Sequence, residues 1–435
     1  MVQSTLTTRI SLLERLRDAL LKYERPLCDA LWQDLHKSYE EAYITELSIV
    51  LDEIDFHIKH LHSWMKPQKV ATPLKLYPSS SQIVCEPLGR VLIISPWNYP
   101  VQLLLVPLVG AISAGCSAVL KTSPYAPRVS ACLSQMIRDI FDEADVTLME
   151  GHRDVTSALL DQRWDLIFFT GSPALGRVVM EAAAKNLTPV VLELGGKSPC
   201  IVDESANLKL AAKRIAWGKL LNAGQTCIAP DYLYVNERVK DAFLKELAKQ
   251  FDALLQGKPE ESRHFARIVD NGKAFDRLVD YMNDGKVVYG GQFDVETRFI
   301  APTILDGVAP DSPVMQEEIF GPIFPVLTFR NLNDAVEFLD KKEKPLALYY
   351  FGMEGDYVTS HTSSGACCIN DCIMHIANHN LPFGGVGNSG MGAYHGKLSF
   401  DVFTHRKAVL STPRNSDVPF RYMPYNLFKY IKKIL

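Results

Sequence analysis

Short apolar runs alternate with helical patterns between residues 90 and 194, and this alternation limits the possible folds more than any other feature. Runs such as RVLIIS (90–95) and DLIFFTG (165–171) have the length and continuous apolar character of strands buried on both faces. Segments between them, such as VQLLLVPLVGAISAG (101–115), are typical of helices. Strands joined by helices predict an α/β fold with a doubly wound parallel sheet. The other expected strands are SAVLKTS (117–123), VTLME (146–150) and PVVLELGG (189–196).

The segments on either side of this region predict further units. From Thr7 to Met65 the apolar residues have helical spacing, whereas residues 70–87 are rich in Pro and Ser and predict an extended excursion or hairpin. A second series of strand–helix pairs runs to about Asn388 and predicts a second α/β unit. A length of 435 residues suits about two or three packed units.

Composition and charge exclude several classes of protein. Hydrophobic residues make up 47% of the chain and charged residues 22%, as in ordinary globular proteins. Because 46 basic residues face 50 acidic ones, we expect no nucleic-acid partner. Charged residues near the start, Arg9 to Arg17, leave no apolar signal-peptide core. The longest apolar stretch, 101–112, is shorter than the roughly 20 residues that a membrane span needs.

The nine cysteines bear on both localisation and metal binding. Their odd number and scattered positions predict a reduced, cytoplasmic protein. Cys367, Cys368 and Cys372, with His375 and His379, superficially resemble metal ligands. However, no second cluster has the spacing of a zinc site, and the surrounding GACCIND indicates a buried strand. We therefore predict no metal site.

Two apparent nucleotide motifs are better explained otherwise. GVGNSG (385–390) matches a dinucleotide-binding pattern, but it follows NLPFGG rather than a strand, so we interpret it as a tight turn. GGKS (195–198) lacks the first glycine of a phosphate-binding loop, because Val191 occupies that position.

A better cofactor signal is FFTGSPALGR (168–177). Here Gly171 permits a sharp turn after a strand, and Ser172 can cap the next helix. The N-terminus of that helix could face a pyrophosphate. Taken alone, the motif fits an ordinary strand–helix turn equally well.

Three residues in separate segments could carry chemistry. Cys227 lies in a polar Gly/Gln/Thr loop after an expected helix, although most cysteines are simply small apolar residues. Glu193 ends an apolar strand, where a carboxylate is either a general base with a raised pKa or half of a salt bridge. Asn98 follows a strand and could stabilise an oxyanion, although a turn asparagine is common.

A further motif could bind a cofactor. In QEEIFGPIFPV (316–326), Glu318 could bind ribose hydroxyls beside the flat ring of Phe320.

Six motifs together resemble the aldehyde dehydrogenase superfamily, in its order and spacing along nearly the whole chain. The segments DLHKSYEEAYITE (34–46) and LPFGGVGNSGMGAYHGK (381–397) are similar to the shorter, class 3 type. Members of that type are typically homodimers that act on aromatic or medium- to long-chain aldehydes. The six motifs are PWNYP (96–100), FTGS (169–172), ELGGKSP (193–199), GQTC (224–227), EEIFGP (317–322) and LPFGG (381–385).

The resemblance implies three structural parts and a tail. Residues 1–69 and 90–194 would form a Rossmann-type NAD(P)-binding domain, and 195–398 a catalytic domain. Residues 70–89 and 399–412 would form small bridging strands that reach toward a partner subunit. The C-terminal tail, 413–435, ends in a basic amphipathic pattern, for which we favour packing near the substrate entrance or the partner over membrane contact.

The resemblance also implies roles for individual residues. Cys227 would attack the aldehyde as a thiolate and become a thioester, Asn98 and the Cys227 main-chain N–H would hold the oxyanion, and Glu193 would activate water. For NAD or NADP, Lys121 would bind the adenosine ribose, while Gly171 and Ser172 would lie by the pyrophosphate. Glu318 would hold the nicotinamide ribose. The expected cofactor-binding set is Trp97, Lys121, Ser123, Gly171, Ser172, Glu318 and Phe320.

One departure from the family pattern concerns the choice of cofactor. The usual KPSE is here KTSP, so Pro124 stands where NAD-preferring members have a glutamate. A carboxylate there would repel the 2′-phosphate of NADP. We therefore predict that NADP is accepted alongside NAD.

Two other functions are alternatives to hydrolytic aldehyde oxidation. In an acylating, coenzyme A-dependent aldehyde dehydrogenase a thiol takes the acyl group, so the presence of Glu193 argues against it. A binding protein on the same scaffold would have no need to retain Cys227, Glu193 and Asn98 together.

Overall fold

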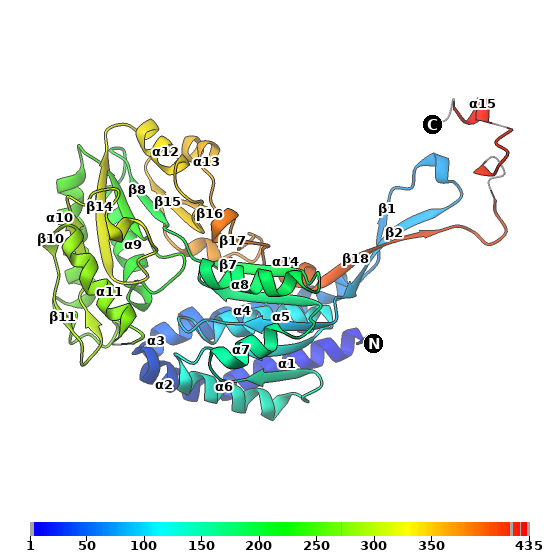
Figure 1. The fold of residues 1–435 in the computed structure, drawn as a ribbon, viewed down its shortest axis with the longest axis horizontal. Helices are drawn as coiled ribbons and strands as arrows, with labels where there is room; N and C mark the ends of the chain where they lie inside the picture. Colours follow the sequence, from blue (N-terminus) through cyan, green and yellow to red (C-terminus); the bar gives the residue numbers. More distant parts are fainter. Residues whose placement is uncertain (1–3, 271, 418–420, 427, 433–435) are drawn as a thin grey trace.

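The computed structural model describes residues 4–270, 272–417, 421–426 and 428–432. Two α/β units lie side by side, and a long narrow arm projects from one of them (Figure 1). The N-terminal helices pack against the unit that bears the arm. Their apolar residues recur at helical spacing and are buried, as at Leu13, Leu16 and Leu20. These elements are α1 (Leu6–Lys22), α2 (Glu24–Leu35), α3 (Tyr39–Ala42), the π-helical turn η1 (Tyr43–Leu47) and α4 (Ser48–Trp64).

The first unit contains a six-stranded sheet in the order β17-β7-β6-β3-β4-β5. All neighbours from β7 to β5 are parallel, which confirms the predicted doubly wound parallel sheet. Helix α5 is buried along its whole length, which explains its unbroken apolar sequence. The strands are β3 (Arg90–Ile94), β4 (Ser117–Lys121), β5 (Val146–Met149), β6 (Leu166–Gly171), β7 (Val190–Leu194) and β17 (Gly390–Met391). The helices are α5 (Gln102–Ala114), α6 (Pro127–Ile140), α7 (Arg153–Leu160) and α8 (Pro173–Ala184).

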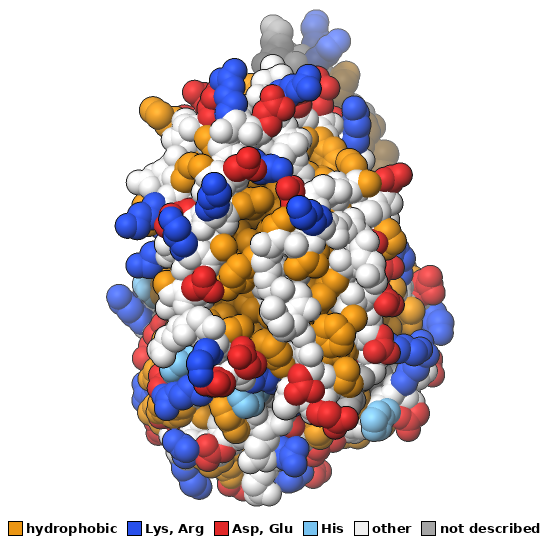
Figure 2. All heavy atoms as spheres, turned by 90° about the vertical axis from the view of Figure 1, so that its left-hand side faces the viewer, with side chains coloured by type: hydrophobic (Ala, Val, Ile, Leu, Met, Phe, Trp, Pro, Cys, Tyr) orange, Lys and Arg blue, Asp and Glu red, His pale blue; other side chains and the backbone are white. Residues whose placement is uncertain are grey.

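The second unit contains a seven-stranded sheet in the order β10-β13-β14-β9-β8-β15-β16. It is parallel except for edge strand β10, which is antiparallel to β13. Its strands are β8 (Pro199–Val202), β9 (Tyr232–Asn236), β10 (Lys286–Tyr289), β13 (Thr303–Asp306), β14 (Ile323–Phe329), β15 (Ala347–Phe351) and β16 (Ala366–Ile369), with a small hairpin of β11 (Phe293–Asp294) and β12 (Phe299–Ile300). Its helices are α9 (Leu208–Leu220), α10 (Lys240–Leu255), α11 (Lys273–Tyr281), α12 (Leu332–Asp340) and α13 (Gly355–His361). Figure 2 shows charges of both signs interspersed over its outer face, with apolar side chains between them.

The arm is a three-stranded antiparallel sheet in the order β1-β2-β18. Its strands are β1 (Gln68–Val70), β2 (Ser80–Pro87) and β18 (Thr404–Ser411), and helix α14 (Lys397–Val402) precedes β18. The Pro/Ser-rich segment therefore forms an extended excursion, as its sequence predicts. Short 3-10 turns connect other elements: η2 (Leu74–Leu76), η3 (Leu221–Gly224), η4 (Met282–Asp284), η5 (Pro313–Met315), η6 (Met374–Ala377) and η7 (Gly387–Ser389).

One expected boundary and the expected helix of the tail differ from the structure. Strand β17 lies within the expected catalytic range 195–398, yet it pairs with β7 and so belongs to the first sheet. The described part of the tail contains the short α-helix α15 (Phe428–Ile431), at the outer end of the arm (Figure 1). Leu427, Lys433, Ile434 and Leu435 of the expected amphipathic helix lie outside the described residues. Within the described ranges, no helix is long and apolar enough to cross a bilayer.

Candidate active site

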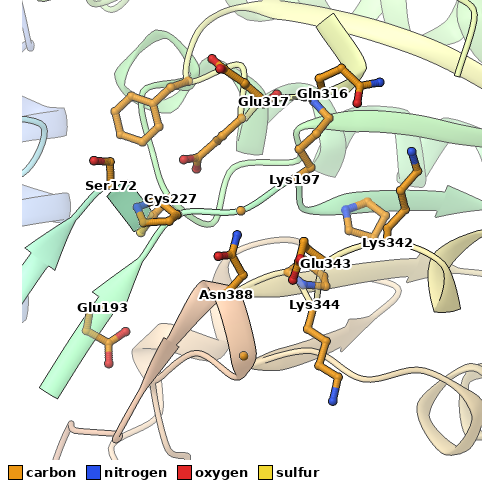
Figure 3. A pocket seen from close by; sticks show the side chains of 18 of the residues that line it. Ser172, Glu193, Lys197, Cys227, Gln316, Glu317, Lys342, Glu343, Lys344 and Asn388 are labelled. Atoms are coloured by element: carbon orange, nitrogen blue, oxygen red, sulfur yellow. Dashed lines mark hydrogen bonds between the residues drawn. The ribbon is translucent and has the colours of Figure 1, made fainter. Parts of the chain in front are cut away.

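The chain order of the first sheet reverses between β3 and β6, and a large cavity opens at the carboxyl ends of these strands. Such reversal points are where open α/β sheets bind ligands, because the connecting loops diverge there. The cavity has a volume of about 1120 Å³ and is also lined by residues of the second unit (Figure 3). Eight predicted site residues line it: Trp97, Asn98, Gly171, Ser172, Glu193, Cys227, Glu318 and Phe320.

Cys227 lies on the loop between η3 and β9 and is partly exposed. In the view of Figure 3 it lies with Ser172 and Glu193 on the left of the cavity, and Lys342 lies on the right. Burial raises the pKa of the Cys227 thiol, and the nearby carboxyls of Glu318 and Glu193 raise it further. The resting sulfur is therefore protonated, so attack as a thiolate requires a group that takes its proton.

Glu193 is fixed in strand β7, where it is paired with Thr170 on one side and Gly390 on the other. Its side chain is 3% exposed. Neither carboxyl oxygen has a hydrogen-bond partner among the described residues. Burial raises the pKa of Glu193 well above its ordinary value, because nothing nearby compensates a buried charge. An unpaired buried carboxyl in a cavity wall can act as a general base for a water in that cavity.

Asn98 is buried in the turn after β3, and its side-chain amide donates a hydrogen bond to the Gln225 carbonyl over 3.0 Å. A carboxamide nitrogen carries two N–H groups, so one remains after this bond. Gln225 precedes Cys227 by two residues, so the bond links the amide to the cysteine loop. The arrangement can present an N–H to an oxygen bound beside Cys227.

The N-terminus of helix α8 also faces the cavity, through Ser172, Pro173 and Ala174. The Ser172 hydroxyl accepts a hydrogen bond from the Leu175 N–H over 3.4 Å, which confirms the predicted cap. Gly171 still belongs to β6, and what requires glycine there is space: an added Cβ would meet the Phe169 ring at 2.5 Å. The expected sharp turn is therefore not its reason. Free N–H groups and the positive end of the helix dipole fit a pyrophosphate.

Glu318 and Phe320 enter the cavity from the second unit. Glu318 packs so tightly against Gly195 that an added Cβ would collide with its carboxyl group. Burial raises the pKa of Glu318 to about 8, and the neighbouring Asp231 adds to the shift. The ring of Phe320 meets that of Trp97 edge to face, with centroids 5.5 Å apart.

The sequence did not predict the residues that hold the Glu318 segment in place at the edge of the cavity. Lys197 donates hydrogen bonds to the Asp231 carboxylate, over 2.5 Å, and to the Glu317 carbonyl, over 2.8 Å. Arg277 donates to the Glu318 carbonyl over 3.0 Å. Lys197 stands within the ELGGKSP motif, which was a usable signal, whereas Asp231 and Arg277 lie outside the six family motifs.

Two expected cofactor residues do not line the cavity. Lys121 ends β4, and its buried ammonium donates hydrogen bonds to the carbonyls of Thr122, over 2.5 Å, and Gly151, over 2.7 Å. Burial lowers the pKa of Lys121. Ser123 is buried in the turn that follows. Both lie at the carboxyl end of the same sheet, beyond the cavity wall.

The structure also shows where the Cys/His cluster at 367–379 and the GVGNSG motif lie. The described residues contain no group of three or more His, Cys, Asp or Glu side chains that could hold a metal ion. Cys368 and His375 do approach each other, with Sγ and Nδ1 3.1 Å apart. GVGNSG forms the turn η7 followed by β17, and its Asn388 lines the cavity, so the turn interpretation is confirmed.

These features define an α/β enzyme whose cavity joins a doubly wound nucleotide-binding type of sheet to a second unit that carries a cysteine. The model of the aldehyde dehydrogenase family matches residues 1–409, and the chain belongs to that family. It is an aldehyde dehydrogenase of the class 3 type, an oxidoreductase that oxidises aldehydes.

Known relatives match over almost the whole length. Aldehyde dehydrogenase family 3 member B1 of Mus musculus is 45% identical over 423 residues, which are 96% of this chain and 90% of the relative. The dimeric NADP-preferring aldehyde dehydrogenase of Canis lupus familiaris is 43% identical over 421 residues, 96% of this chain and 93% of the relative. The substrate-bound structure of Staphylococcus aureus AldH has a TM-score of 0.97 and 44% identity, and the match covers 100% of this chain and 96% of that one.

Proposed function

We propose that this enzyme oxidises aromatic or medium- to long-chain aldehydes to carboxylic acids through a thioester on Cys227, with NAD or NADP as hydride acceptor. The observation that carries the proposal is the meeting of Cys227, Glu193 and Asn98 in one cavity that also exposes the N-terminus of α8. The test is the absorbance of reduced cofactor with hexanal and with benzaldehyde, in the absence of coenzyme A. Turnover only after coenzyme A is added would identify the acylating reaction instead.

The first half of the reaction uses Cys227 and Asn98. Once the Cys227 thiol has released its proton to solvent, the sulfur forms a bond to the aldehyde carbon, while the carbonyl π electrons move to oxygen and create an oxyanion. The free Asn98 N–H and the Cys227 main-chain N–H hold that oxyanion, and one such donor typically contributes on the order of 3 kcal/mol. The bound nicotinamide would supply the acceptor for the departing hydride, which leaves the acyl group on Cys227.

The second half of the reaction uses Glu193. Its carboxylate takes a proton from water as the water oxygen attacks the thioester carbon, and the carbon–sulfur bond breaks to release the acid. For the cofactor, we propose that Ser172 and Gly171 lie by the pyrophosphate, Lys121 and Ser123 by the adenosine ribose, Glu318 by the nicotinamide ribose, and Phe320 with Trp97 by the ring. The Ser172 cap and the tight Gly195–Glu318 contact support this assignment of the cofactor site.

The pH dependence of deacylation should report the raised pKa of Glu193. Only the carboxylate can accept the proton, so the deacylation rate falls as the pH drops through that pKa. Because burial raises the pKa, the acid limb should lie clearly above about pH 4.3, where an exposed glutamate titrates. Single-turnover decay of the acyl-enzyme across a pH series measures the limb. A rate that stays constant down to about pH 5 would contradict the assignment.

Pro124 should determine how well NADP is used. It lies in the turn between β4 and α6, at the position where the family resemblance implies a glutamate in NAD-preferring members. Pro124→Glu should lower kcat/KM for NADP relative to NAD by about tenfold or more, because the new carboxylate repels the 2′-phosphate. Pro124→Gln, which adds no charge, should keep comparable use of both cofactors. A wild-type preference for NAD of about a hundredfold would contradict this account.

We also propose a cytoplasmic homodimer with the three-part organisation 1–69 and 90–194, 195–398, and 70–89 with 399–412, in which strand β17 of the second range belongs to the sheet of the first. The arm supports this assembly because it stands away from the rest of its own chain (Figure 1). The described part of the tail lies at the outer end of the arm, so it can pack near a substrate entrance only if that entrance belongs to a partner. Light scattering of the purified protein tests the proposal: the mass of a single chain would contradict it.

A further inference from the structure

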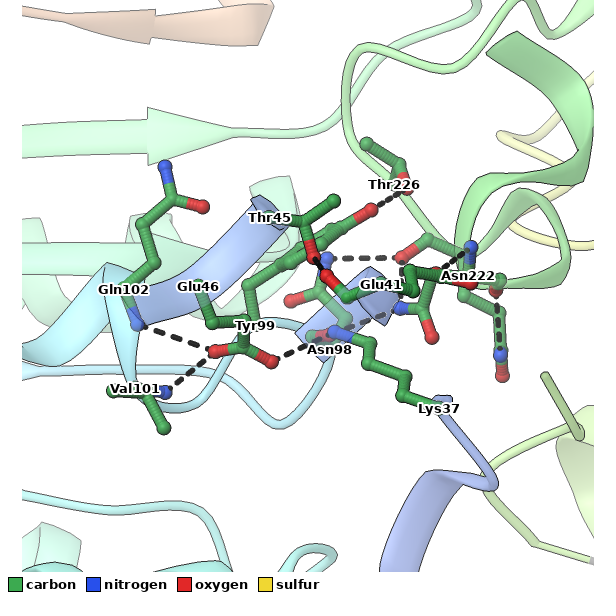
Figure 4. A network of polar contacts seen from close by, with 11 residues as sticks. Lys37, Glu41, Thr45, Glu46, Asn98, Tyr99, Val101, Gln102, Asn222 and Thr226 are labelled. Atoms are coloured by element: carbon green, nitrogen blue, oxygen red, sulfur yellow. Dashed lines mark hydrogen bonds and ion pairs between the residues drawn. The ribbon is translucent and has the colours of Figure 1, made fainter. Parts of the chain in front are cut away.

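A buried ion pair lies directly behind the turn that carries Asn98 (Figure 4). The ammonium of Lys37 is 2.7 Å from the Glu46 carboxylate and donates a second hydrogen bond, also of 2.7 Å, to the Asn98 carbonyl. Both side chains of the pair are completely buried. The same ammonium lies 3.8 Å from the centre of the Tyr99 ring, within range of a cation–π contact. Lys37 therefore contacts two consecutive residues of the turn.

Glu46 holds the other end of the same turn. Its second carboxylate oxygen accepts hydrogen bonds from the Val101 N–H, over 2.8 Å, and the Gln102 N–H, over 3.2 Å. These groups begin helix α5, whose own capping residue makes no side-chain cap. A carboxylate there satisfies free N–H groups and opposes the positive end of the helix dipole. Lys37 thus binds the turn at the Asn98 carbonyl, and Glu46 binds it at the N–H groups of Val101 and Gln102.

The segment 34–46, which contains Lys37 and Glu46, also contacts the loop that carries Cys227. The Asn222 side chain donates hydrogen bonds to the carbonyls of Asn98, over 2.9 Å, and Gln225, over 3.1 Å. The Asn222 N–H donates to the Glu41 carboxylate over 2.7 Å. Asn222 and the next residue, Ala223, have φ values of 49° and 51°, in the left-handed region that asparagine tolerates but alanine rarely adopts, so contacts from outside help to hold this turn. Residues of the 34–46 segment therefore contact both loops on which an oxyanion would depend.

Stability alone is a weak explanation for such a pair. Removing two charges from water is expensive, and apolar residues of similar volume often replace a buried ion pair without loss of stability. A hydrogen-bond donor in an active site, by contrast, must be held to within about 0.5 Å of its productive position. One Asn98 N–H is already directed at Gln225, so the position of the main chain at Asn98 fixes where the other N–H points.

We propose that Lys37 and Glu46 are positioning residues of the oxyanion site: the pair fixes the Asn98 turn and thereby aims the free Asn98 amide N–H beside Cys227. The inference rests on the proposed function, because it needs Asn98 to act as the oxyanion donor. Neither residue touches the substrate in this account. The pair acts entirely through Asn98.

A double-mutant cycle tests this directly. Lys37→Met should lower the rate of the hydride-transfer burst about 10- to 100-fold, with unchanged affinity for NADP, and Asn98→Ala should lower it about 100-fold or more. The variant that combines Lys37→Met with Asn98→Ala should be no slower than Asn98→Ala alone, because the pair then has no amide to aim. Glu46→Gln, which keeps the size of the side chain, should give the same non-additive result if Lys37→Met does not fold.

Arg9→Met is the matched control for loss of a buried cation. Arg9 is 5% exposed and donates hydrogen bonds to Ser4 and the Ser113 carbonyl, away from the cavity. It should lower stability but leave the burst rate within about twofold. Multiplying effects in the double variant would overturn the inference, as would a loss of NADP affinity as large as the loss of rate. If Asn98→Ala itself left the rate unchanged, the oxyanion role of Asn98 would fail first.

Discussion

Cys227→Ala should abolish aldehyde oxidation, with kcat reduced by at least about 10⁴-fold under either cofactor. Alanine has no atom that can bond to the aldehyde carbon, so neither the oxyanion nor the thioester can form. The substitution leaves helix α8 and the Glu318 side of the cavity intact, so the affinity for NADP should be unchanged. The measurement is reduced-cofactor absorbance with hexanal, together with calorimetric titration of NADP.

Cys132→Ala is a matched control for this prediction. Cys132 is also partly exposed, but it lies on α6 and does not line the cavity. It should keep wild-type turnover. A Cys227→Ala enzyme that retained turnover within about tenfold of wild type would show that another residue is the nucleophile.

Glu193→Gln should separate the two halves of the reaction. Glutamine keeps the shape of the side chain but cannot accept a proton from water, so steady-state turnover should fall by about 10²- to 10⁴-fold. Acylation should still occur once, because Cys227 and Asn98 are intact. Stopped-flow absorbance should therefore show a burst of about one reduced cofactor per site followed by a slow phase.

Glu181→Gln is the control for the removal of a carboxylate, because Glu181 is exposed on the surface of α8. It should leave both phases unchanged. A Glu193→Gln enzyme without any burst would mean that Glu193 takes the Cys227 proton before attack. Undiminished steady-state turnover would remove Glu193 from the reaction altogether.

The sequence predicted the main sheet and most of the cavity wall because both depend on local patterns. Buried parallel strands are continuous apolar runs, so the strand that precedes Asn98 and the strand that bears Glu193 could be recognised directly. Cys227 was distinguished by its polar neighbours and by the motif around it. The ordered motifs then implied that these three residues lie in one cavity, as the structure places them.

Other parts of the site depend on contacts between segments that are distant in sequence. The bond from Lys37 to the Asn98 carbonyl joins residues 61 positions apart, and that from Asn98 to Gln225 joins residues 127 apart. A lysine in a polar helical segment is usually solvated, so nothing local marks Lys37 as completely buried. Likewise, β17 is only two residues long, and its pairing with β7 has no signal in its own sequence.

The C-terminal tail differs from the helix that its sequence predicts for a related reason. The sequence pattern of YNLFKYIKKIL favours an amphipathic helix, but an isolated helix of this length is marginally stable in water without a surface to pack on. Within the described residues of the tail, the α-helix is confined to Phe428–Ile431, at the outer end of the arm. The pattern thus predicts a conformation that needs a partner surface.

The central claim is that catalysis passes through a thioester on Cys227 that Glu193 hydrolyses. The most direct test is rapid quenching of Glu193→Gln with hexanal and NADP, followed by mass spectrometry of the peptide that contains Cys227. We expect a hexanoyl group on that peptide at close to one per site within the first turnover, and none on the same peptide from Cys227→Ala. A burst of reduced cofactor without any acyl group on Cys227 would contradict the account.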